Sequence, residues 1–323
     1  MSPAVSHRLG SMALSSLLIF ALVLAGCGAS KRKIPNPYHV TTTASIAQGP
    51  IVVRHITYTA FDGERVPALF SIPRATSPRG CLIWQHGFGV GASTEQAQRF
   101  WYPAARLGLG VFAIDLRDTG QRATSPRERA RVLNSPALLK ALVVGTVKDL
   151  KRATDYLYSQ PACHHNIGFA GLSLGGAVGS VFTAQDPRIR VVVLMSVPPS
   201  WQAGVQDVPY ALPGFRHQPA RLRAALRTLS PLDPARWIGQ ISPRPLLLLF
   251  GRFDPIVPAS SRRVDIAVAR QPKAVVVYNG GHVPFLGPAA AESAYKVGLF
   301  LLKYLVEPTY GALGQVVTPA GAP

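Results

Sequence analysis

The sequence predicts a single α/β domain whose central sheet is mostly parallel and carries helices on both faces. Short apolar runs alternate with longer stretches of helical character between residues 51 and 306. The runs are apolar at consecutive positions, as expected for strands that are buried on both faces. Hydrophobic residues make up 48% of the 323 residues, which suffices for such a core and excludes a chain that is disordered throughout.

The predicted elements follow one another from residue 51 onward. Two opening strands, Ile51–Phe61 and Val66–Ile72, flank the turn signal Asp62-Gly63 and predict an antiparallel hairpin at one edge of the sheet. Buried strands are expected at Cys81–Gln85, Gly110–Ile114, Ile167–Ala170, Val191–Leu194, Leu246–Phe250 and Ala274–Tyr278. Helices are expected around residues 94–107, 136–159, 174–184, 260–270 and 289–305.

The amino terminus has the features of a secretion signal. Residues 12–25 are apolar but too few to span a bilayer comfortably, and they follow Arg8. They run into Leu24-Ala25-Gly26-Cys27, which resembles the lipobox of bacterial lipoproteins. The resemblance implies that residues 1–26 are removed and that acylated Cys27 anchors the protein to a membrane of the bacterial cell envelope, facing outside the cytoplasm. The alternative is an ordinary secretory signal with an incidental cysteine.

The two flanking segments and the net charge complete this organisation. Residues 27–50 are polar and aperiodic and predict a flexible tether, and residues 307–323 predict a loose tail. With 34 Lys and Arg against 15 Asp and Glu, the chain carries a net charge of +19, which suits an anionic surface. The arginines are scattered and lie in no nucleic-acid-binding motif, so nucleic acid is not expected as a partner.

A candidate nucleophile lies in Gly171-Leu172-Ser173-Leu174-Gly175, where a predicted strand turns into a predicted helix. A sharp turn of this kind needs small residues two positions before and after the nucleophile, and Gly171 and Gly175 supply them. The turn would expose the hydroxyl of Ser173 above the sheet. The alternative is a glycine-rich turn that only packs a helix.

A serine hydroxyl needs a base to remove its proton, and the base needs an acid to orient it. Asp254 follows the strand Leu246–Phe250, and His282 follows the strand Ala274–Tyr278. Both therefore lie at the carboxyl ends of strands, as Ser173 does. Asp115, Asp118 and Asp233 are the competing candidates for the acid.

The order Ser173, Asp254, His282, each after a buried strand, resembles the α/β-hydrolase superfamily over residues 51–306. The position between serine and histidine favours Asp254 as the acid. Further segments are similar to the dienelactone hydrolase and acetyl xylan esterase-like branch: Asp115–Gly120, Asp155–Tyr158 and Ser230–Asp233. Dienelactone hydrolases have a cysteine where this chain has serine, and this difference favours ordinary ester hydrolysis.

The resemblance also implies an oxyanion site and a cap. His86-Gly87-Phe88-Gly89 resembles the HGxG oxyanion loop, so the backbone N–H groups of Phe88 and Leu174 are the expected oxyanion donors. His86 is expected to hold this loop in place rather than to act as a base. Residues from about 198 to 243 are expected to form a small cap.

These features predict an enzyme that hydrolyses a small-molecule carboxylic ester through an acyl-enzyme, with no metal or other cofactor. Cys163, His164 and His165 are not expected to bind zinc because no second ligand set follows them. An amidase, a peptidase or an acyltransferase with the same triad remains an alternative. A non-catalytic binding lipoprotein is less favoured, since it would not need the complete triad and oxyanion loop. The sequence indicates neither the ester nor the oligomeric state.

Cys81 and Cys163 are the two thiols that remain if Cys27 is acylated, in a compartment where disulfides form. In the sheet order that the resemblance implies, the strand opened by Cys81 lies beside the strand that leads to Ser173. The two cysteines are therefore a candidate disulfide, and the sequence leaves open whether they are bridged. Cys163 lies three residues too far from its strand end, so residues 161–166 must fold back. The alternative is a buried free thiol at Cys81.

Overall fold

The computed structural model describes residues 38–93, 95–123, 125–163, 165–198, 200–201 and 218–307. The predicted signal peptide, Cys27 and residues 308–323 of the predicted tail lie outside the described residues. The compact unit that contains the sheet begins at Tyr38. No helix among the described residues combines the length and the hydropathy needed to cross a membrane.

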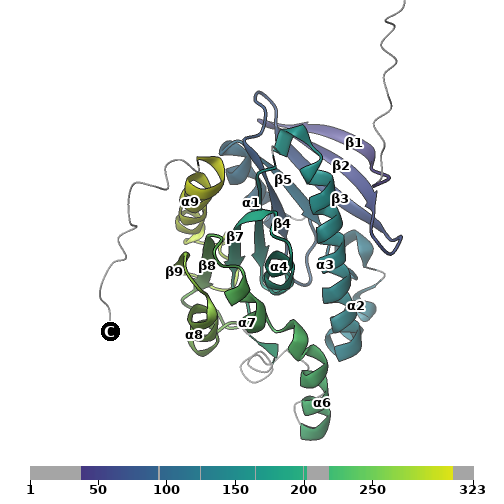
Figure 1. The fold of residues 1–323 in the computed structure, drawn as a ribbon, viewed down its shortest axis with the longest axis vertical. Coiled ribbons are helices and arrows are strands. Elements are labelled where there is room, and N and C mark those ends of the chain that lie inside the picture. The colour runs from purple at the N-terminus through teal and green to yellow at the C-terminus, as the bar shows by residue number, and fades with distance from the viewer. Residues whose placement is uncertain are drawn as a thin grey trace, which may run out of the picture. The chain divides into compact units, whose positions relative to one another are not determined.

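A sheet of nine strands forms the centre of the described unit, in the order β1-β2-β3-β5-β4-β6-β7-β8-β9 (Figure 1). The strands from β5 to β9 along this order pair in parallel, whereas β1, β2 and β3 are antiparallel. The predicted, mostly parallel sheet is confirmed. The strand bounds are Thr41–Gln48, Ile51–Thr59, Arg65–Pro73, Gly80–Gln85, Leu109–Ile114, Ile167–Leu172, Ile189–Met195, Leu246–Gly251 and Lys273–Tyr278 for β1 to β9.

Helices cover both faces of the sheet (Figure 1). Side chains alternate between the faces along each strand, so that Ile83 and Phe169 pack under α3 and α4, and Leu82 and Ala170 pack under α1 and α9. The helix bounds are α1 (Glu95–Arg106), α2 (Pro126–Leu133), α3 (Pro136–Tyr158), α4 (Leu174–Gln185), α6 (Pro219–Leu229), α7 (Pro234–Trp237), α8 (Ala259–Val268) and α9 (Ala290–Leu301).

Strand β1 corrects the predicted boundary of the tether. The sequence predicts a tether over residues 27–50, but Thr41–Gln48 pairs with β2 and extends the predicted hairpin into three antiparallel strands. An edge strand has solvent on much of its surface, and Ile46 is 45% exposed. The alternation of apolar and polar residues that predicts a half-buried strand is therefore missing from this segment.

A further expectation needs correction. Strand β9 is the opposite edge of the sheet and is not buried on both faces, since Val275 is 38% exposed. Within the predicted cap, 198–243, α7 packs against α4 and α8 and continues the helix layer on that face of the sheet. Residues 202–217 of the predicted cap lie outside the described residues.

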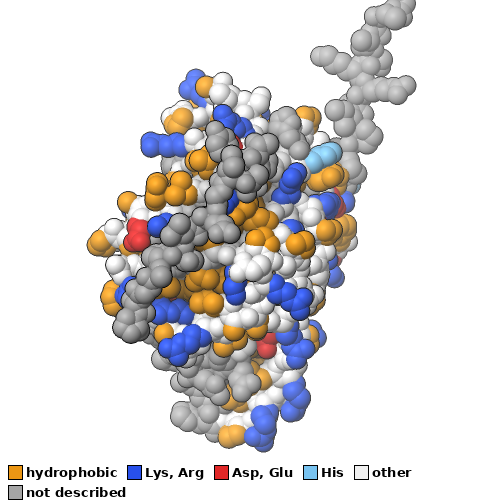
Figure 2. Space-filling model, turned by 60° about the vertical axis from the view of Figure 1, so that its left-hand side comes forward, with side chains coloured by type: hydrophobic (Ala, Val, Ile, Leu, Met, Phe, Trp, Pro, Cys, Tyr) orange, Lys and Arg blue, Asp and Glu red, His pale blue; other side chains and the backbone are white. Residues whose placement is uncertain are grey.

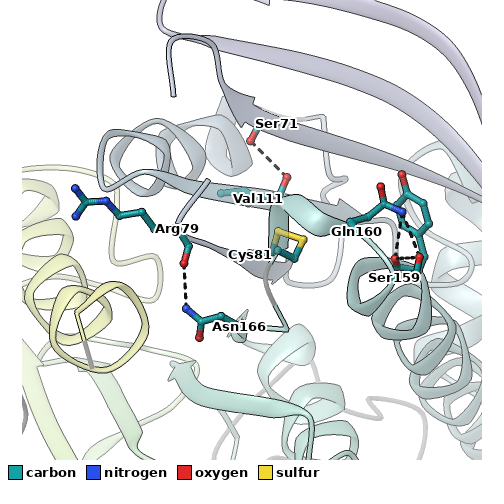
Figure 3. Close-up of a disulfide and its surroundings, with 9 residues drawn as sticks. Ser71, Arg79, Cys81, Val111, Ser159, Gln160 and Asn166 are labelled. Atoms are coloured by element: carbon teal, nitrogen blue, oxygen red, sulfur yellow. Dashed lines mark hydrogen bonds between the residues drawn. A yellow bond between two sulfur atoms is a disulfide. The ribbon is translucent and has the colours of Figure 1, made fainter. Parts of the chain in front are cut away.

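Cys81 and Cys163 form a disulfide at the amino-terminal end of β4 (Figure 3). Cys81 is opposite Ile167 in the parallel pairing of β4 with β6, so the chain before β6 must turn back to bring Cys163 near it. A turn of 3-10 helix at Pro161–Cys163 does this and leaves the two Cα atoms 5.0 Å apart. Asn166 fixes the turn, because its carbonyl accepts the N–H of Cys81 and its Nδ2 donates to the carbonyl of Arg79.

Removing this disulfide should destabilise the fold strongly. The bond joins residues separated by 82 positions, and the loop entropy that it removes from the unfolded chain corresponds to about 4.5 kcal/mol. The variant with Cys81→Ala and Cys163→Ala should unfold at a lower denaturant concentration, and reductant should shift the parent protein in the same direction but leave the variant unchanged. Two separately alkylated peptides from a non-reduced digest, with no linked pair, would contradict the bridge.

Asp265 on α8 is a buried carboxyl group whose two oxygens have no hydrogen-bond partner. Burial raises its pKa well above the usual value, because the charged form loses its hydration. The folded protein therefore keeps a proton that the unfolded chain releases above about pH 4. From the unfolded pKa up to the raised folded pKa, this group lowers stability as the pH rises.

Replacing Asp265 with leucine should therefore stabilise the protein. A side chain of similar size without polar atoms removes a desolvation cost of about 1–3 kcal/mol. Thermal unfolding should show a higher midpoint for Asp265→Leu, with a larger gain at pH 8 than at pH 4. The exposed carboxylate Glu292 provides the control, because Glu292→Gln changes the net charge without changing a buried group. A lower midpoint for Asp265→Leu, or a gain independent of pH, would contradict the prediction.

Candidate active site

Ser173 lies at a sharp turn between the end of β6 and the start of α4. Its φ of 54° and ψ of −121° place a non-glycine residue in a strained backbone region. The backbone N–H of Ser173 donates to the carbonyl of Met195 at 2.8 Å, which ties the turn to β7. Ser173 is partly exposed, although the residues on either side of it are buried. This is the conformation that the sequence predicts for an exposed nucleophile.

The two predicted glycines are required by close backbone contacts. A Cβ on Gly175 would lie 2.3 Å from the carbonyl oxygen of His86, and a Cβ on Gly171 would lie 2.7 Å from the carbonyl oxygen of Gly175. Neither contact is possible for a larger residue without moving the backbone. Gly175 therefore allows the start of α4 to pack directly against the loop that follows β4.

His282 and Asp254 form a hydrogen-bonded pair. The His282 Nδ1 lies 2.8 Å from the Asp254 Oδ2, with 15% of the histidine side chain and none of the aspartate side chain exposed. The other carboxylate oxygen, Oδ1, accepts the backbone N–H groups of Ile256 and Val257 at 2.7 and 2.9 Å. Three hydrogen bonds thus fix a buried carboxylate that orients the imidazole. Both residues follow strands parallel to β6, so they lie at the carboxyl ends of the strands, as Ser173 does.

The loop that carries His282 is held by Tyr278 and Gly251, neither of which the sequence analysis singles out. The Tyr278 hydroxyl donates to the carbonyl oxygen of Gly281, next to the histidine. Burial, together with the charge of Asp254, raises the pKa of Tyr278, so the hydroxyl keeps its proton and remains a donor. A Cβ on Gly251 would lie 2.0 Å from the Gly281 oxygen, so only glycine allows this approach.

The predicted oxyanion loop packs against the turn at Ser173. A Cβ on Gly87 would lie 3.3 Å from the Ser173 Cβ, so the backbone of this loop passes beside the nucleophile. Phe88 follows Gly87, and Leu174 is the first residue of α4, where backbone N–H groups have no partner within the helix. The structure therefore places the loop that continues into Phe88 beside Ser173, and Leu174 directly follows Ser173 in the chain.

Two buried side chains, His86 and Asp115, support the predicted oxyanion loop. His86 is 1% exposed, with its Nδ1 2.7 Å from the Gly87 oxygen and its Nε2 3.3 Å from the Asp115 Oδ1. The same carboxylate accepts the backbone N–H groups of Ala92 and Gln121. Burial opposes its ionisation, but these hydrogen bonds outweigh burial and keep the pKa of Asp115 below its usual value. Asp115 is thus a positioning residue for this loop and not the partner of His282.

A buried cluster of ion pairs supports the segment after β5. Asp149 on α3 is fully buried and binds Arg117 through bonds of 3.0 and 2.6 Å and Arg122 through a bond of 2.8 Å. Arg122 also donates to the backbone carbonyl of Asp115 at 3.1 Å. No local pattern in the sequence predicts this cluster. Its one visible signal is an aspartate on the mostly apolar face of the helix predicted at 136–159.

The remaining candidates make other contacts. Asp233 accepts the backbone N–H of Trp201 at 2.7 Å. Burial raises its pKa, although Trp201 and Arg236 oppose the shift. Cys163 is in the disulfide, and His165 stacks on Tyr158 with ring centroids 3.9 Å apart. Within the part of the chain that the structure describes, no three His, Cys, Asp or Glu side chains are grouped to hold a metal ion.

Sequence comparisons relate the chain to hydrolases. The family model described as "BAAT / Acyl-CoA thioester hydrolase C terminal" matches residues 149–209, which include Ser173. The uncharacterized protein YfhR of Salmonella typhi is 24% identical over 284 residues, which cover 83% of this chain and 87% of YfhR. Esterase YjfP of Escherichia coli is 26% identical over 200 residues, covering 60% of this chain and 77% of YjfP.

Solved structures with a similar fold include two acetyl xylan esterases. The enzyme from Paenibacillus sp. R4 has a TM-score of 0.67 and 20% identity, and the match covers 83% of this chain and 90% of that enzyme. Acetyl xylan esterase 1 from Thermoanaerobacterium has a TM-score of 0.65 and 20% identity, covering 82% and 88%. The resemblance expected from the sequence is confirmed at the level of the fold. The chain has the α/β-hydrolase fold, with helices on both faces of a mostly parallel sheet.

Proposed function

We propose that this protein is a serine hydrolase that cleaves carboxylic esters, with Ser173 as nucleophile, His282 as base and Asp254 as the acid that orients the base. One observation carries the proposal. The hydrogen-bonded pair of His282 and buried Asp254 follows strands parallel to β6, whose end holds Ser173 in a strained, partly exposed turn. A binding protein would have no use for this combination.

The reaction begins when His282 takes the proton of the Ser173 hydroxyl and the serine oxygen attacks the carbonyl carbon of the ester. The carbonyl oxygen becomes an oxyanion, which the N–H groups of Phe88 and Leu174 bind. The bond to the alcohol breaks as His282 returns the proton to the leaving oxygen, and an acyl-enzyme remains. Water, activated by His282, releases the acid and regenerates the serine. These steps use no metal and no other cofactor.

A thioester is the second candidate substrate. The matched family model is described as an acyl-CoA thioester hydrolase, and it covers the segment that contains Ser173. An oxygen ester is supported by the other similar proteins, which are named esterase YjfP and acetyl xylan esterases. Both reactions pass through the same acyl-enzyme and differ in the leaving group.

A substrate comparison tests the proposal. The purified protein is assayed with nitrophenyl esters from acetate to dodecanoate and with acyl thioesters of the same chain lengths. The proposal expects turnover of at least one ester series and a higher kcat/KM for the ester than for the matched thioester. Activity confined to thioesters would favour the second candidate, and no turnover of either series would overturn the proposed function.

We further propose that the mature protein is anchored by acylated Cys27 to a membrane of the cell envelope and faces outside the cytoplasm. The match of Leu24 to Cys27 with a lipobox, directly after an apolar stretch, supports this placement. Several acyl chains on one residue bury enough methylene groups for stable attachment.

Metabolic labelling with a fatty-acid analogue tests the anchor. The parent protein should incorporate the analogue and fractionate with membranes, because the acyl chains partition into the bilayer. Cys27→Ser should lose both the label and the membrane association. Label that persists in Cys27→Ser would contradict the lipoprotein proposal.

A further inference from the structure

An apolar groove runs between α1 and α9, on the face of the sheet opposite α3 and α4. It has a volume of about 390 Å³, which lies within the range of small-molecule sites. The mechanism proposed above makes no use of it. Of the described residues that line the groove, Arg106 alone is charged.

Small residues on α9 leave the space between the two helices unfilled at this point. Ala294 and Gly298 lie one turn apart and both line the groove. A Cβ on Gly298 would meet only the Leu107 side chain, at 3.9 Å, so the space beside this glycine is open. The lining from Ala294 to Leu302 extends over about 12 Å along the helix axis, at 1.5 Å per residue.

Packed aromatic side chains form the inner end of the groove. Phe100 stacks on Trp84, with ring centroids 4.1 Å apart, and contacts Phe285 at 5.3 Å. Phe100 and Phe285 are 3% and 4% exposed, so they form a fixed wall rather than a mobile rim. Phe285 lies three residues after His282, on the loop that leads from the catalytic histidine to α9.

Arg106 lies at the other end of the groove, in the last turn of α1, and is exposed. It is about 9 Å from Phe100 along the helix axis, because six residues separate them. The site therefore has one cationic end and one aromatic end, joined by apolar walls. On the face shown in Figure 2, Lys and Arg side chains greatly outnumber Asp and Glu side chains, which also favours an anionic ligand.

We infer that this groove binds a medium-chain fatty acid anion, with the carboxylate at Arg106 and the methylene chain directed toward Phe100 and Phe285. An alkyl chain needs no hydrogen bonds and suits the apolar walls. A peptide backbone would leave its N–H and C=O groups without partners there. The single guanidinium complements the single charge of a carboxylate. This inference does not depend on the proposed esterase activity.

Titration of the full chain with dodecanoate tests the inference. The titration uses the Ser173→Ala variant, in which turnover cannot contribute to the measured heat. Calorimetry should show one saturable site, and its affinity should rise with chain length from hexanoate, by up to about fourfold per methylene, until the groove is filled. An affinity that does not change with chain length, or no saturable binding, would overturn the inference.

Variants of the lining locate the site. Gly298→Leu and Ala294→Leu fill the groove and should each weaken dodecanoate binding at least tenfold, whereas Ala291→Leu, at an exposed position on the same helix, should not. Arg106→Gln should weaken binding of dodecanoate by about fivefold but leave binding of dodecanol nearly unchanged. Thermal unfolding of each variant checks that it is folded.

Two other outcomes would each overturn the inference. Dodecanoate binding that survives Gly298→Leu but disappears after phosphonate modification of the parent protein would place the ligand in the active site. Light scattering that shows a dimer of the parent protein and a monomer of Gly298→Leu would assign the groove to a second copy of the chain.

Discussion

Replacing Ser173 with alanine is expected to lower kcat for ester hydrolysis by about 10⁴-fold or more, because no other group can form the acyl-enzyme. His282→Ala should be nearly as severe, since the serine would lose the base that takes its proton. Initial rates with the best nitrophenyl ester from the chain-length series measure both effects. The residual rate should reflect the oxyanion donors alone.

Ser180→Ala is the matched control for this prediction. Ser180 lies on α4, two turns beyond Ser173, and its hydroxyl donates to the carbonyl of Ala177 within the same helix. This variant should keep nearly full activity. An alanine variant at position 173 that hydrolyses esters as fast as the parent would show that the nucleophile lies elsewhere.

The second large effect is expected at Asp115, which touches neither the nucleophile nor the base. Asparagine cannot accept hydrogen bonds at both side-chain positions, so Asp115→Asn must lose the N–H bond from Ala92 or from Gln121. It also loses the charge beside His86, whose ring supports the loop that contains Phe88. Misplacing one oxyanion donor costs about 10²- to 10³-fold in kcat.

Kinetics should separate this positioning effect from a general loss of stability. Asp115→Asn should lower kcat by about 10²-fold with a much smaller change in KM, since the donor acts mainly in the transition state. Asp118→Asn in the same segment should keep its activity, because asparagine tolerates the φ of 58° at that position. Asp149→Asn should lower the unfolding temperature while reducing kcat less than Asp115→Asn. Equal losses of kcat in the Asp115 and Asp149 variants would contradict a specific role for Asp115.

The sequence predicts correctly those elements whose own residue pattern shows which faces are buried. Strands such as Leu246–Gly251 are buried on both faces, so every residue is apolar, and the residues just beyond them lie at one edge of the sheet. This is why the sequence could place Ser173, Asp254 and His282 just beyond the carboxyl ends of parallel strands before any contact was known. Their positions depend on the parallel topology alone.

The elements that the sequence analysis misses are stabilised by contacts that no local pattern reveals. Strand β1 has few buried side chains, and α6 is arginine-rich with only Ala225 and Leu229 buried. The sequence around Asp149 shows only a polar residue on a mostly apolar helix face. Its partner Arg117 lies 32 residues earlier in the chain, so the ion pair is visible only in the fold. Long-range pairings of this kind follow from the fold and cannot be read from spacing.

The disulfide also depends on contacts that the local sequence does not reveal. The sheet order implied by the resemblance places Cys81 and Cys163 in neighbouring segments, but the spacing along the strands argues against the bond. The 3-10 turn before β6 resolves the mismatch, and it depends on Asn166 contacting the backbone on both sides of Gly80. A Cβ on Gly80 would lie 2.7 Å from the Asn166 Nδ2, so this contact also requires glycine at position 80.

Peptide mapping of the parent protein after reaction with a fluorophosphonate tests the central claim most directly. The reagent forms a stable bond only with a serine that has been activated as a nucleophile. The account predicts one phosphonate per chain, located by mass spectrometry on the peptide that contains Ser173. A folded protein that takes up no phosphonate, or that carries it on another residue, would contradict the assignment of Ser173, His282 and Asp254 as a catalytic triad.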